Sequence, residues 1–432
     1  MTADLRRALA EGPLTRFQLA AIAVCVGLNM LDGFDILAMS FAASGVKSSW
    51  QLLDSQLGQL FSAGLVGMGV GSLLLGPCAD RWGRRNVILF SVALAGAGML
   101  GSAAARGFGD LRALRVVTGL GIGGTIASAA VIVSEYAPDR SRRAALGTFA
   151  TGYSIGAFLG GSLAAFAIPR YGWRSAFVIG GAMSLLLLPV AWRRLPESLD
   201  FLLSRRPRSA LARANALLSA MRQPPVGELP PPAAGDALGL RAQLGILMTP
   251  STLLVWTMYF ATMAGFYFIV SWTPHMLKEA GLSTTQGLTG GVLLNLGGTI
   301  GCAGYAVAAV RADAHRLLLA SLIGSALVIY AFSLTMTHLD AALWTALLLG
   351  IISNAAMAGL YAVGPPLYPA AVRATGMGWA IGIGRFGAIL SPYWSGVLRD
   401  QGWQPAALYT LFVAPFLVAA LAMLVIGRAR PA

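Results

Sequence analysis

The chain has 432 residues, of which 56% are hydrophobic and only 11% are charged, whereas soluble domains carry about 25% charged residues. It also contains 53 glycines, and glycine is more frequent in membrane helices than in soluble ones. This composition excludes a soluble globular domain and indicates a polytopic helical membrane protein. The formal net charge of +14 does not indicate nucleic-acid binding, because the basic residues alternate with the apolar runs and form no single patch.

Apolar runs of about 20 residues, the length that crosses a bilayer, recur along the whole chain. They predict an all-α membrane protein with twelve transmembrane helices, near 17–43, 52–78, 86–105, 112–135, 144–168, 173–192, 251–277, 287–310, 315–335, 340–364, 374–397 and 405–427. A long polar stretch separates the sixth span from the seventh. It predicts an N-terminal six-helix bundle at 1–195, a cytoplasmic central loop at 196–249 with a short surface helix within 209–222, and a C-terminal six-helix bundle at 250–432.

The basic residues predict which ends of the spans face the cytoplasm. Of the Lys and Arg residues outside the middle of the spans, 22 fall on the side that carries both termini and 7 on the other side. By the positive-inside rule, both termini are expected in the cytoplasm. We expect a multi-pass, monomeric protein of a bacterial cytoplasmic (inner) membrane, in contact with the lipid bilayer.

The first span contains three polar residues that a lipid-facing helix would not carry: Asn29, Asp32 and Asp35. An ionised carboxylate at the centre of a bilayer costs about 3 kcal/mol on insertion scales. The spacing of three residues puts both carboxylates on nearly one face of a helix, with Asn29 one turn earlier. The pair therefore predicts a hydrated or paired interior site for a substrate or a proton.

An internal repeat supports the division into two six-span halves. Three landmarks recur after 230 residues: Arg143-Ala144 and Arg373-Ala374, Gly152 and Gly382, and Gly172-Trp173 and Gly402-Trp403. Two repeated bundles joined by a long central loop are typical of secondary transporters, which bind their substrate near the middle of the membrane between the halves.

Two motifs connect the chain with a known family. Between the second and third spans, residues 76–85 read G-P-C-A-D-R-W-G-R-R, which resembles the loop signature G-x-x-x-D-R-x-G-R-[RK] of the major facilitator superfamily. In the first span, Asp32-Gly33-Phe34-Asp35 looks like the D-G-x-D signature of the aromatic acid:proton symporter family within it, and Trp272-Thr273-Pro274 and the string 373–378 agree. The resemblance implies the twelve-helix fold of that superfamily and the import of a small aromatic carboxylate, such as a hydroxybenzoate, by proton symport through alternating access.

The resemblance also implies roles for single residues. The residues expected in proton coupling and substrate binding are Asp32, Asp35, Arg115 and Glu135. The residues expected in the loops and gates are Asp80, Arg81, Arg84, Arg85, His315 and Arg373. One position departs from the family pattern: Val310 stands where an aspartate is expected between the eighth and ninth spans, and Asp313 lies close enough in sequence to replace it.

Arg385 points to a mechanism independently of any family. It lies about a dozen residues into the eleventh span, and an arginine effectively never deprotonates, so it needs a buried anion. We predict that this anion is Asp32 or Asp35 in the empty protein and a substrate carboxylate in the loaded one. Protonation of either aspartate would then free Arg385 for the substrate. The alternative is a static salt bridge to the first span.

Aromatic and amide side chains inside the spans are candidates for a pocket that holds a flat ring by offset stacking. They are Asn29, Phe34, Tyr153, Tyr259, Tyr267, Asn295, Asn354, Tyr361 and Trp379. The alternative for each is a role in helix packing. His275 and His338 fall near the external ends of their spans and are expected to be solvated.

No cofactor, metal site or catalytic residue is predicted, because the chain carries no H-E-x-x-H, G-x-S-x-G or Walker motif and its three cysteines have no metal-ligand spacing. A membrane enzyme is therefore disfavoured. A sensor is disfavoured because the longest loop and the tails are too short for the soluble output domain that sensors usually carry. Two alternatives keep the fold but differ in function, namely transport of another organic anion or metabolite, and efflux. The two aspartates together with Arg385 favour the import of an anion.

Overall fold

The computed structural model describes residues 12–207, 209–229, 245, 248–369 and 372–428. Within these residues the regular elements are helices, and no strand is present. The first group is α2 (Arg16–Trp50), α3 (Asp54–Trp82), α4 (Arg84–Ala103), α5 (Phe108–Tyr136), α6 (Asp139–Tyr171) and α7 (Arg174–Arg194). Two short helices follow, α8 (Leu199–Arg205) and α9 (Ala210–Ala220). The second group is α11 (Pro250–Glu279), α12 (Thr284–Ala308), α13 (Ala314–Thr335), α14 (Leu339–Val363), the 3-10 helix η1 (Pro365–Leu367), α15 (Arg373–Asp400), α16 (Pro405–Leu411) and α17 (Val413–Arg428).

The predicted all-α membrane fold is confirmed. In the described part of the chain, 11 helical segments are long and apolar enough to cross a membrane, with α16 and α17 together forming one of them. The remaining predicted span, 374–397, corresponds to α15, whose 28 residues are long enough to cross but include charged residues. The first span, predicted to end at residue 43, continues to Trp50 as a helix of 35 residues. At 1.5 Å per residue, that helix is about 50 Å long and exceeds the roughly 30 Å hydrocarbon core.

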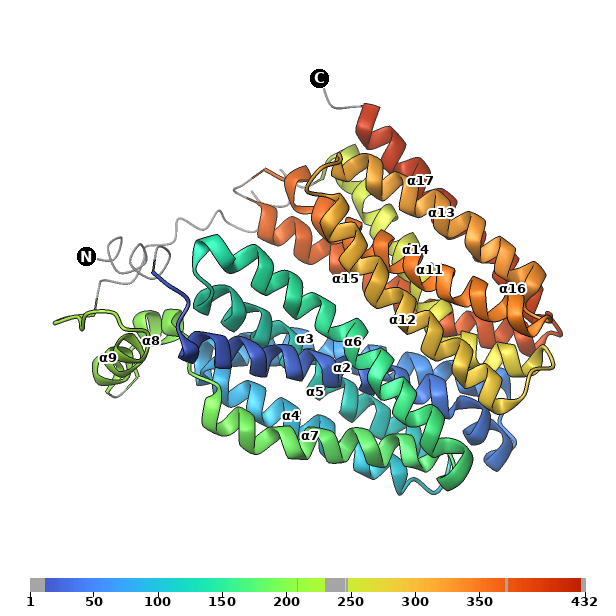
Figure 1. The fold of residues 1–432 in the computed structure, drawn as a ribbon, viewed down its shortest axis with the longest axis horizontal. Helices are drawn as coiled ribbons and strands as arrows, with labels where there is room; N and C mark the ends of the chain where they lie inside the picture. The colour runs from blue at the N-terminus through green and yellow to red at the C-terminus, as the bar shows by residue number, and fades with distance from the viewer. Residues whose placement is uncertain (1–11, 208, 230–244, 246–247, 370–371, 429–432) are drawn as a thin grey trace.

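The helices are arranged in two groups that lie side by side. Figure 1 shows α2–α7, coloured blue to green, on one side and α11–α17, coloured yellow to red, on the other. Between the groups, α2 packs against α11, α3 against α15, and α6 against α12. The residues repeated after 230 positions occupy equivalent places: Gly172 follows α6 with φ of 76°, and Gly402 follows α15 with φ of 90°, a left-handed conformation that favours glycine.

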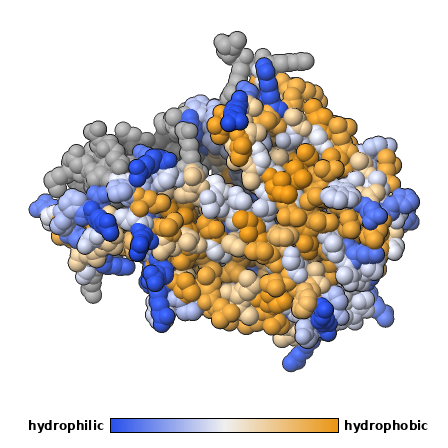
Figure 2. All heavy atoms as spheres, viewed as in Figure 1, coloured by the Kyte–Doolittle hydropathy of each residue, from blue (hydrophilic) through white to orange (hydrophobic). Residues whose placement is uncertain are grey.

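Two ends of the bundle need names. The terminal end is the one at which α2 begins and α17 ends, and it also carries α8 and α9 (Figure 1). The distal end is the opposite one, where α2 ends at Trp50 and α3 begins at Asp54. Figure 2 shows apolar side chains over most of the visible flank of the bundle and the most hydrophilic ones toward its ends, as a membrane-spanning protein requires.

Local sequence signals set the bounds of several helices. Thr15 caps α2, because its hydroxyl accepts a hydrogen bond from the Gln18 N–H while the Gln18 side chain accepts one from the Thr15 N–H. Ser283 and Gln286 form the same capping box at the start of α12. In the central loop, α9 lies within the predicted stretch 209–222. It packs against α8 through small and apolar side chains.

Candidate functional site

Asp32 and Asp35 are buried near the middle of α2. The two residues are 4% and 1% exposed, so both carboxylates lie inside the protein rather than against lipid. One oxygen of each, Oδ2 of Asp32 and Oδ1 of Asp35, has no hydrogen-bond partner among the described residues. A buried polar atom without a partner costs about 1–3 kcal/mol, which a helix-packing role alone does not repay. The pair therefore has the properties of a site that binds a proton, water or ligand.

Gly33, between the two acids, brings α6 against α2. A Cβ at Gly33 would overlap the backbone carbonyl oxygen of Tyr153, so the two backbones can approach only because this residue is glycine. The close approach places Tyr153 beside Asp32, and the Tyr153 hydroxyl lies within electrostatic reach of that carboxylate. The hydroxyl is buried and also lacks a hydrogen-bond partner among the described residues. The D-G-x-D motif thus supplies both the acids and the room for a neighbouring phenol.

Arg115 of α5 is the guanidinium that contacts Asp35. It is 2% exposed, and its Nη2 donates a hydrogen bond of 2.9 Å to the backbone carbonyl oxygen of Asp35. Its charge also attracts the Asp35 carboxylate. Its Nε has no hydrogen-bond partner among the described residues. Because an arginine stays charged when buried, Arg115 balances one of the two carboxylates.

Arg385 does not form the predicted ion pair. No salt bridge in the described part of the chain joins it to Asp32 or Asp35, and its Nη1 instead contacts the sulfur of Met68 on α3. The half-buried guanidinium lies within electrostatic reach of the hydroxyls of Tyr153 and Tyr361. The physical reason is that Arg115 lies on α5, which packs directly against α2 and already supplies a cation at Asp35. A half-buried arginine without a carboxylate can accept an anion from outside the protein.

Three of the predicted ring-pocket residues interact electrostatically with one another, and two of them, Tyr153 and Tyr361, also with Arg385. The Tyr153 hydroxyl of α6 interacts electrostatically with Tyr267 of α11 and Tyr361 of α14 as well as with Arg385. Tyr361 is 45% exposed although it lies among these interior groups. An exposed aromatic ring beside a cation and a buried acid is the composition expected of a site for a flat organic anion. The two halves contribute to this central group, which consists of Asp32, Tyr153, Tyr267, Tyr361 and Arg385.

Phe34 and Tyr259 serve helix packing instead. The Phe34 ring is 1% exposed and lies against Gly160 of α6 and Gly180 of α7, within the first group of helices. The Tyr259 hydroxyl donates a hydrogen bond of 2.8 Å to the carbonyl oxygen of Leu360. Its ring meets that of Tyr361 edge-on, with centroids 6.1 Å apart. Tyr259 is therefore a fully buried packing partner of Tyr361 and is not itself exposed to a ligand.

The three predicted amide residues each use their NH₂ group on a backbone carbonyl. Asn29 donates across to α6, whereas Asn295 and Asn354 donate within their own helices; the acceptors are the carbonyl oxygens of Phe149, Gly291 and Gly350. Asn354 also packs against α12 at Gly298. Trp379 is 47% exposed, and its ring centroid is 6.1 Å from that of Trp256. It lies six residues before Arg385, toward the terminal end of α15.

The loop residues of the first half form a separate network at the terminal end. Arg84 contacts Asp80 at 3.4 Å, and Arg85 donates to the carbonyl oxygens of Leu195 and Trp192, while Arg81 is exposed. Glu135 belongs to this network, since its carboxylate accepts hydrogen bonds from the Ser198 hydroxyl and the Leu199 N–H. The structure therefore places Glu135 with the loop and not with Asp32 and Asp35.

The corresponding loop of the second half is built differently around the expected aspartate position. Val310 is 83% exposed. Asp313, which could replace the expected aspartate, instead caps α13 by accepting hydrogen bonds from the N–H groups of Arg316 and His315. These bonds favour the ionised carboxylate and hold the pKa of Asp313 below its usual value. The imidazole of His315 is 3.9 Å from the same carboxylate, and Arg373 is exposed at the start of α15.

The two halves contact each other through the distal part of the central helices. The Ser40 hydroxyl of α2 donates to the carbonyl oxygens of Val270 and Ser271 on α11, at 2.9 and 2.6 Å. The Ser62 hydroxyl of α3 donates to the carbonyl oxygen of Ile389 on α15 at 2.6 Å. These residues lie on the distal side of the central group, so the two halves are joined on that side of it.

A cluster of five charged or titratable residues at the distal end was not predicted from the sequence. His275, expected to be solvated, is 2% exposed and lies among Lys47, Asp54, Glu279 and Arg399 at the distal end. Charged residues at the ends of spans are ordinary, so nothing in their sequence positions distinguished these five. His338, in contrast, is exposed as expected.

Comparison with known proteins agrees with this geometry. The family model described as Major Facilitator Superfamily matches residues 23–392. The chain is 33% identical to a gallate transporter of Pseudomonas putida, over 99% of this chain and 96% of that protein. It is 31% identical to the 4-hydroxybenzoate transporter PcaK of Pseudomonas putida, over 98% of this chain and 96% of that protein.

Solved structures show the same fold. A crystal structure of a D-xylose-proton symporter superposes with a TM-score of 0.75 at 17% identity, covering 96% of this chain and 98% of that one. The family match, the near full-length relatives and the shared helical architecture lead to one conclusion: the chain belongs to the Major Facilitator Superfamily of membrane transporters.

Proposed function

We propose that the protein imports a small aromatic carboxylate, of the hydroxybenzoate class, together with protons across a bacterial cytoplasmic membrane. The observation that carries this proposal is Arg385, a half-buried cation with no carboxylate partner among the described residues, beside Tyr153 and Tyr361 and opposite the buried Asp32. The relatives named for gallate and 4-hydroxybenzoate support the substrate class. The guanidinium holds the carboxylate, and the tyrosine rings hold the flat ring.

Charge balance supports the coupling to protons. The empty site holds two carboxylates, Asp32 and Asp35, and two guanidiniums, Arg115 and Arg385, and all four groups are wholly or half buried. When both aspartates are ionised, their two negative charges cancel the two positive charges, and the empty site is neutral. A substrate anion would make it negative, and uncompensated charge in a low-dielectric interior is costly. Protonation of one aspartate restores neutrality. We therefore propose at least one proton for each monoanionic substrate.

The structure also supports a transport cycle by alternating access between two halves, 1–195 and 250–432, connected by the cytoplasmic loop 196–249. The positive-inside rule assigns the terminal end, with both chain termini, to the cytoplasm. In this orientation, the contacts of Ser40 and Ser62 close the external side. In this proposal the protein acts as a monomer without a cofactor, and the loop residues Asp80, Arg84 and Arg85 hold the cytoplasmic end.

Transport by purified protein in liposomes tests the proposal. Uptake of radiolabelled 4-hydroxybenzoate or gallate is expected to exceed equilibrium when the outside is acidified, and to stop when a protonophore removes the gradient. Arg385→Gln should abolish uptake, whereas Asp110→Asn, at an exposed acid near the distal end of α5, should leave it unchanged. Accumulation of substrate without a gradient, or full activity of Arg385→Gln, would contradict the proposal.

A further inference from the structure

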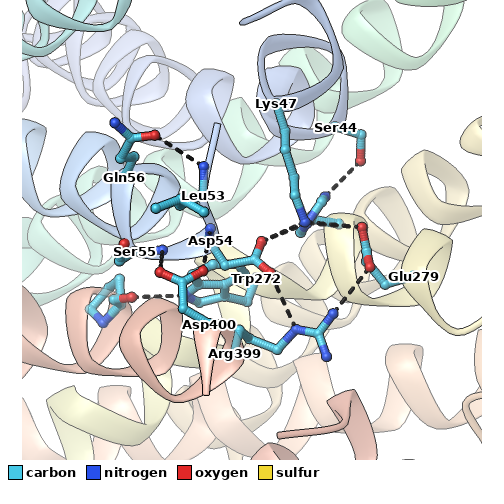
Figure 3. Close-up of polar contacts among 12 residues, drawn as sticks. Ser44, Lys47, Leu53, Asp54, Ser55, Gln56, Trp272, Glu279, Arg399 and Asp400 are labelled. Carbon is cyan, nitrogen blue, oxygen red and sulfur yellow. Dashed lines mark hydrogen bonds and ion pairs between the residues drawn. The ribbon is translucent and has the colours of Figure 1, made fainter. Parts of the chain in front are cut away.

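Asp54 lies at the distal end, where the two halves meet, next to basic side chains from three helices. Its carboxylate is 2.7 Å from Nζ of Lys47, 3.5 Å from Nε of Arg399 and 3.6 Å from Nε2 of His275. Lys47 comes from α2, His275 from α11 and Arg399 from α15, and Figure 3 shows the Lys47 and Arg399 side chains converging on it. The acid from the first half is thus held by two helices of the second half.

Glu279, at the end of α11, is a second acid in the same cluster. Its carboxylate is 3.3 Å from Nζ of Lys47, 3.1 Å from Nη2 of Arg399 and 3.6 Å from Nε2 of His275. Two ion pairs therefore cross between the halves, Lys47 with Glu279 and Arg399 with Asp54. The two permanent cations balance the two acids.

The start of α3 depends on the second half as well. Leu53, the residue before α3, has no side-chain acceptor and cannot cap the helix. The carboxylate of Asp400, on α15, takes this role: it accepts hydrogen bonds from the N–H groups of Asp54 and Ser55 at 2.8 and 3.0 Å (Figure 3). An anion at a helix N-terminus is also favoured by the helix dipole.

The cluster is buried around Asp54 and Arg399 and reaches solvent at Lys47 and Glu279. The side chains of Asp54 and Arg399 are 9% and 12% exposed, and those of Lys47 and Glu279 are 24% and 32% exposed. Water and salt weaken ion pairs at a surface, but they weaken the largely buried pair of Asp54 and Arg399 much less. The crossing pairs therefore contribute to how the halves sit relative to each other.

We propose that Lys47, Asp54, Glu279 and Arg399, with Asp400 as the cap of α3, form an ionic latch that holds the distal end closed. The inference rests on the alternating access proposed above, in which the distal end must open to admit substrate. Opening there separates α2 and α3 from α11 and α15, and so breaks both crossing ion pairs and both hydrogen bonds to Asp400. The latch favours the state closed at the distal end and sets how often the other state is reached.

The buried residue Ser40 offers a reporter for distal opening. It is 3% exposed and bonds across the halves to α11. In the full-length protein with Cys25, Cys78 and Cys302 replaced, Ser40→Cys reports opening through its alkylation rate by a membrane-impermeant maleimide. Asp54→Asn combined with Glu279→Gln should raise that rate about tenfold, a typical size for coupling between two states. Asp110→Asn removes an acid that bonds within its own half, to the Arg106 N–H, and should leave the rate unchanged.

A distance measurement that does not depend on Ser40 accompanies this test. Spin labels at Gln51→Cys and Gln404→Cys, exposed distal positions on the two halves, should show a larger population of long distances in the Asp54→Asn, Glu279→Gln protein. Monodisperse elution of each variant shows that it is folded. If folded variants keep both the alkylation rate and the distance distribution of the parent, the latch does not exist.

These readouts need no substrate, so the latch and the transport proposal can fail separately. Faster alkylation in the latch variants, together with no uptake of aromatic acid by the parent protein, would support the latch and refute the proposed substrate. Unchanged alkylation together with proton-driven uptake would do the opposite.

Discussion

The Arg115 guanidinium donates a hydrogen bond of 2.9 Å to the backbone carbonyl oxygen of Asp35. This contact distinguishes the roles of two arginines, the buried Arg115 and the half-buried Arg385. Arg115 balances one of the two acids, and Arg385, across the centre of the protein, remains available to a substrate anion. With Arg115 beside the acids and Arg385 free for the substrate, the protein can bind an anion and a proton together. The net charge of the site then changes little.

The acid pair gives the first prediction. Asp32→Asn and Asp35→Asn keep the shape of each side chain but cannot exchange a proton. Proton-driven accumulation of 4-hydroxybenzoate should be lost in both, because the anion can no longer be neutralised by protonation. Counterflow of labelled against unlabelled substrate needs no net proton movement, so at least one of the two variants should retain it. Accumulation at the parental level in both would show that neither acid couples transport to protons.

Arg115 should be required for the integrity of the acid pair and not only for transport. Arg115→Leu leaves the Asp35 carboxylate buried without its cation, and removing one member of a buried pair costs about 3–5 kcal/mol. A lower melting temperature in detergent is therefore expected along with loss of uptake. Arg385→Leu, at a half-buried residue without a carboxylate partner among the described residues, should abolish uptake with a much smaller shift. Equal shifts for the two variants would contradict the division of roles.

Tyr361, the exposed tyrosine of the central group, should set the affinity for the aromatic ring of the substrate. Tyr361→Ala removes a ring that is 45% exposed next to Arg385. The apparent affinity for 4-hydroxybenzoate should fall about fivefold to tenfold, the worth of one aromatic contact. Tyr361→Phe keeps the ring and should lose less. Binding to purified protein, measured by calorimetry, gives the comparison, and identical affinities for the Ala and Phe variants would remove Tyr361 from the ring site.

Gly33 should tolerate no larger residue. In Gly33→Ala, the new methyl group would overlap the Tyr153 carbonyl oxygen, and overpacking of this kind costs about 1–3 kcal/mol. Both the melting temperature and transport should fall. Gly69→Ala in α3 is the matched control, because a Cβ there meets nothing within 4 Å. A Gly33→Ala protein as stable and active as the control would show that the α2–α6 contact is not as close as described.

Asp313 gives a prediction that depends on pH. Its pKa is below the usual value because backbone N–H groups donate to the ionised carboxylate. A depressed pKa in the folded state contributes stability that is present above the unfolded pKa, about 4, and is lost as the pH falls through the folded value. Asp313→Ala should therefore lower the melting temperature at neutral pH and make little difference in strong acid. Asp313→Asn, also a good cap, should behave like the parent at pH 7. A pH-independent effect of the Ala variant would exclude the capping role.

How far the sequence predicted this molecule depended on whether the signal was local. Apolar run lengths predicted the spans, and the cost of charge in lipid singled out Asp32 and Asp35. The partner of those acids was mispredicted, because whether Arg115 or Arg385 reaches Asp35 depends on how α5 and α15 pack, which no spacing along the chain encodes. Phe34 lies between the two acids in sequence, yet its ring packs against Gly160 of α6 and Gly180 of α7, because the small residues that receive it belong to helices distant in the sequence. The cluster around Asp54 was not predicted at all, since its members come from four helices and each is unremarkable at the end of a span.

The central claim, that uptake of an aromatic anion carries protons through Asp32 and Asp35, is tested most directly by recording the internal pH of liposomes during substrate entry. With a trapped pH dye and no imposed gradient, an inward gradient of 4-hydroxybenzoate should acidify the interior by about one proton per molecule taken up, beyond the change in protein-free liposomes, if a single protonation keeps the site neutral. Asp32→Asn and Asp35→Asn should abolish this acidification. Substrate entry by the parent protein with no acidification beyond that of empty liposomes would contradict the account.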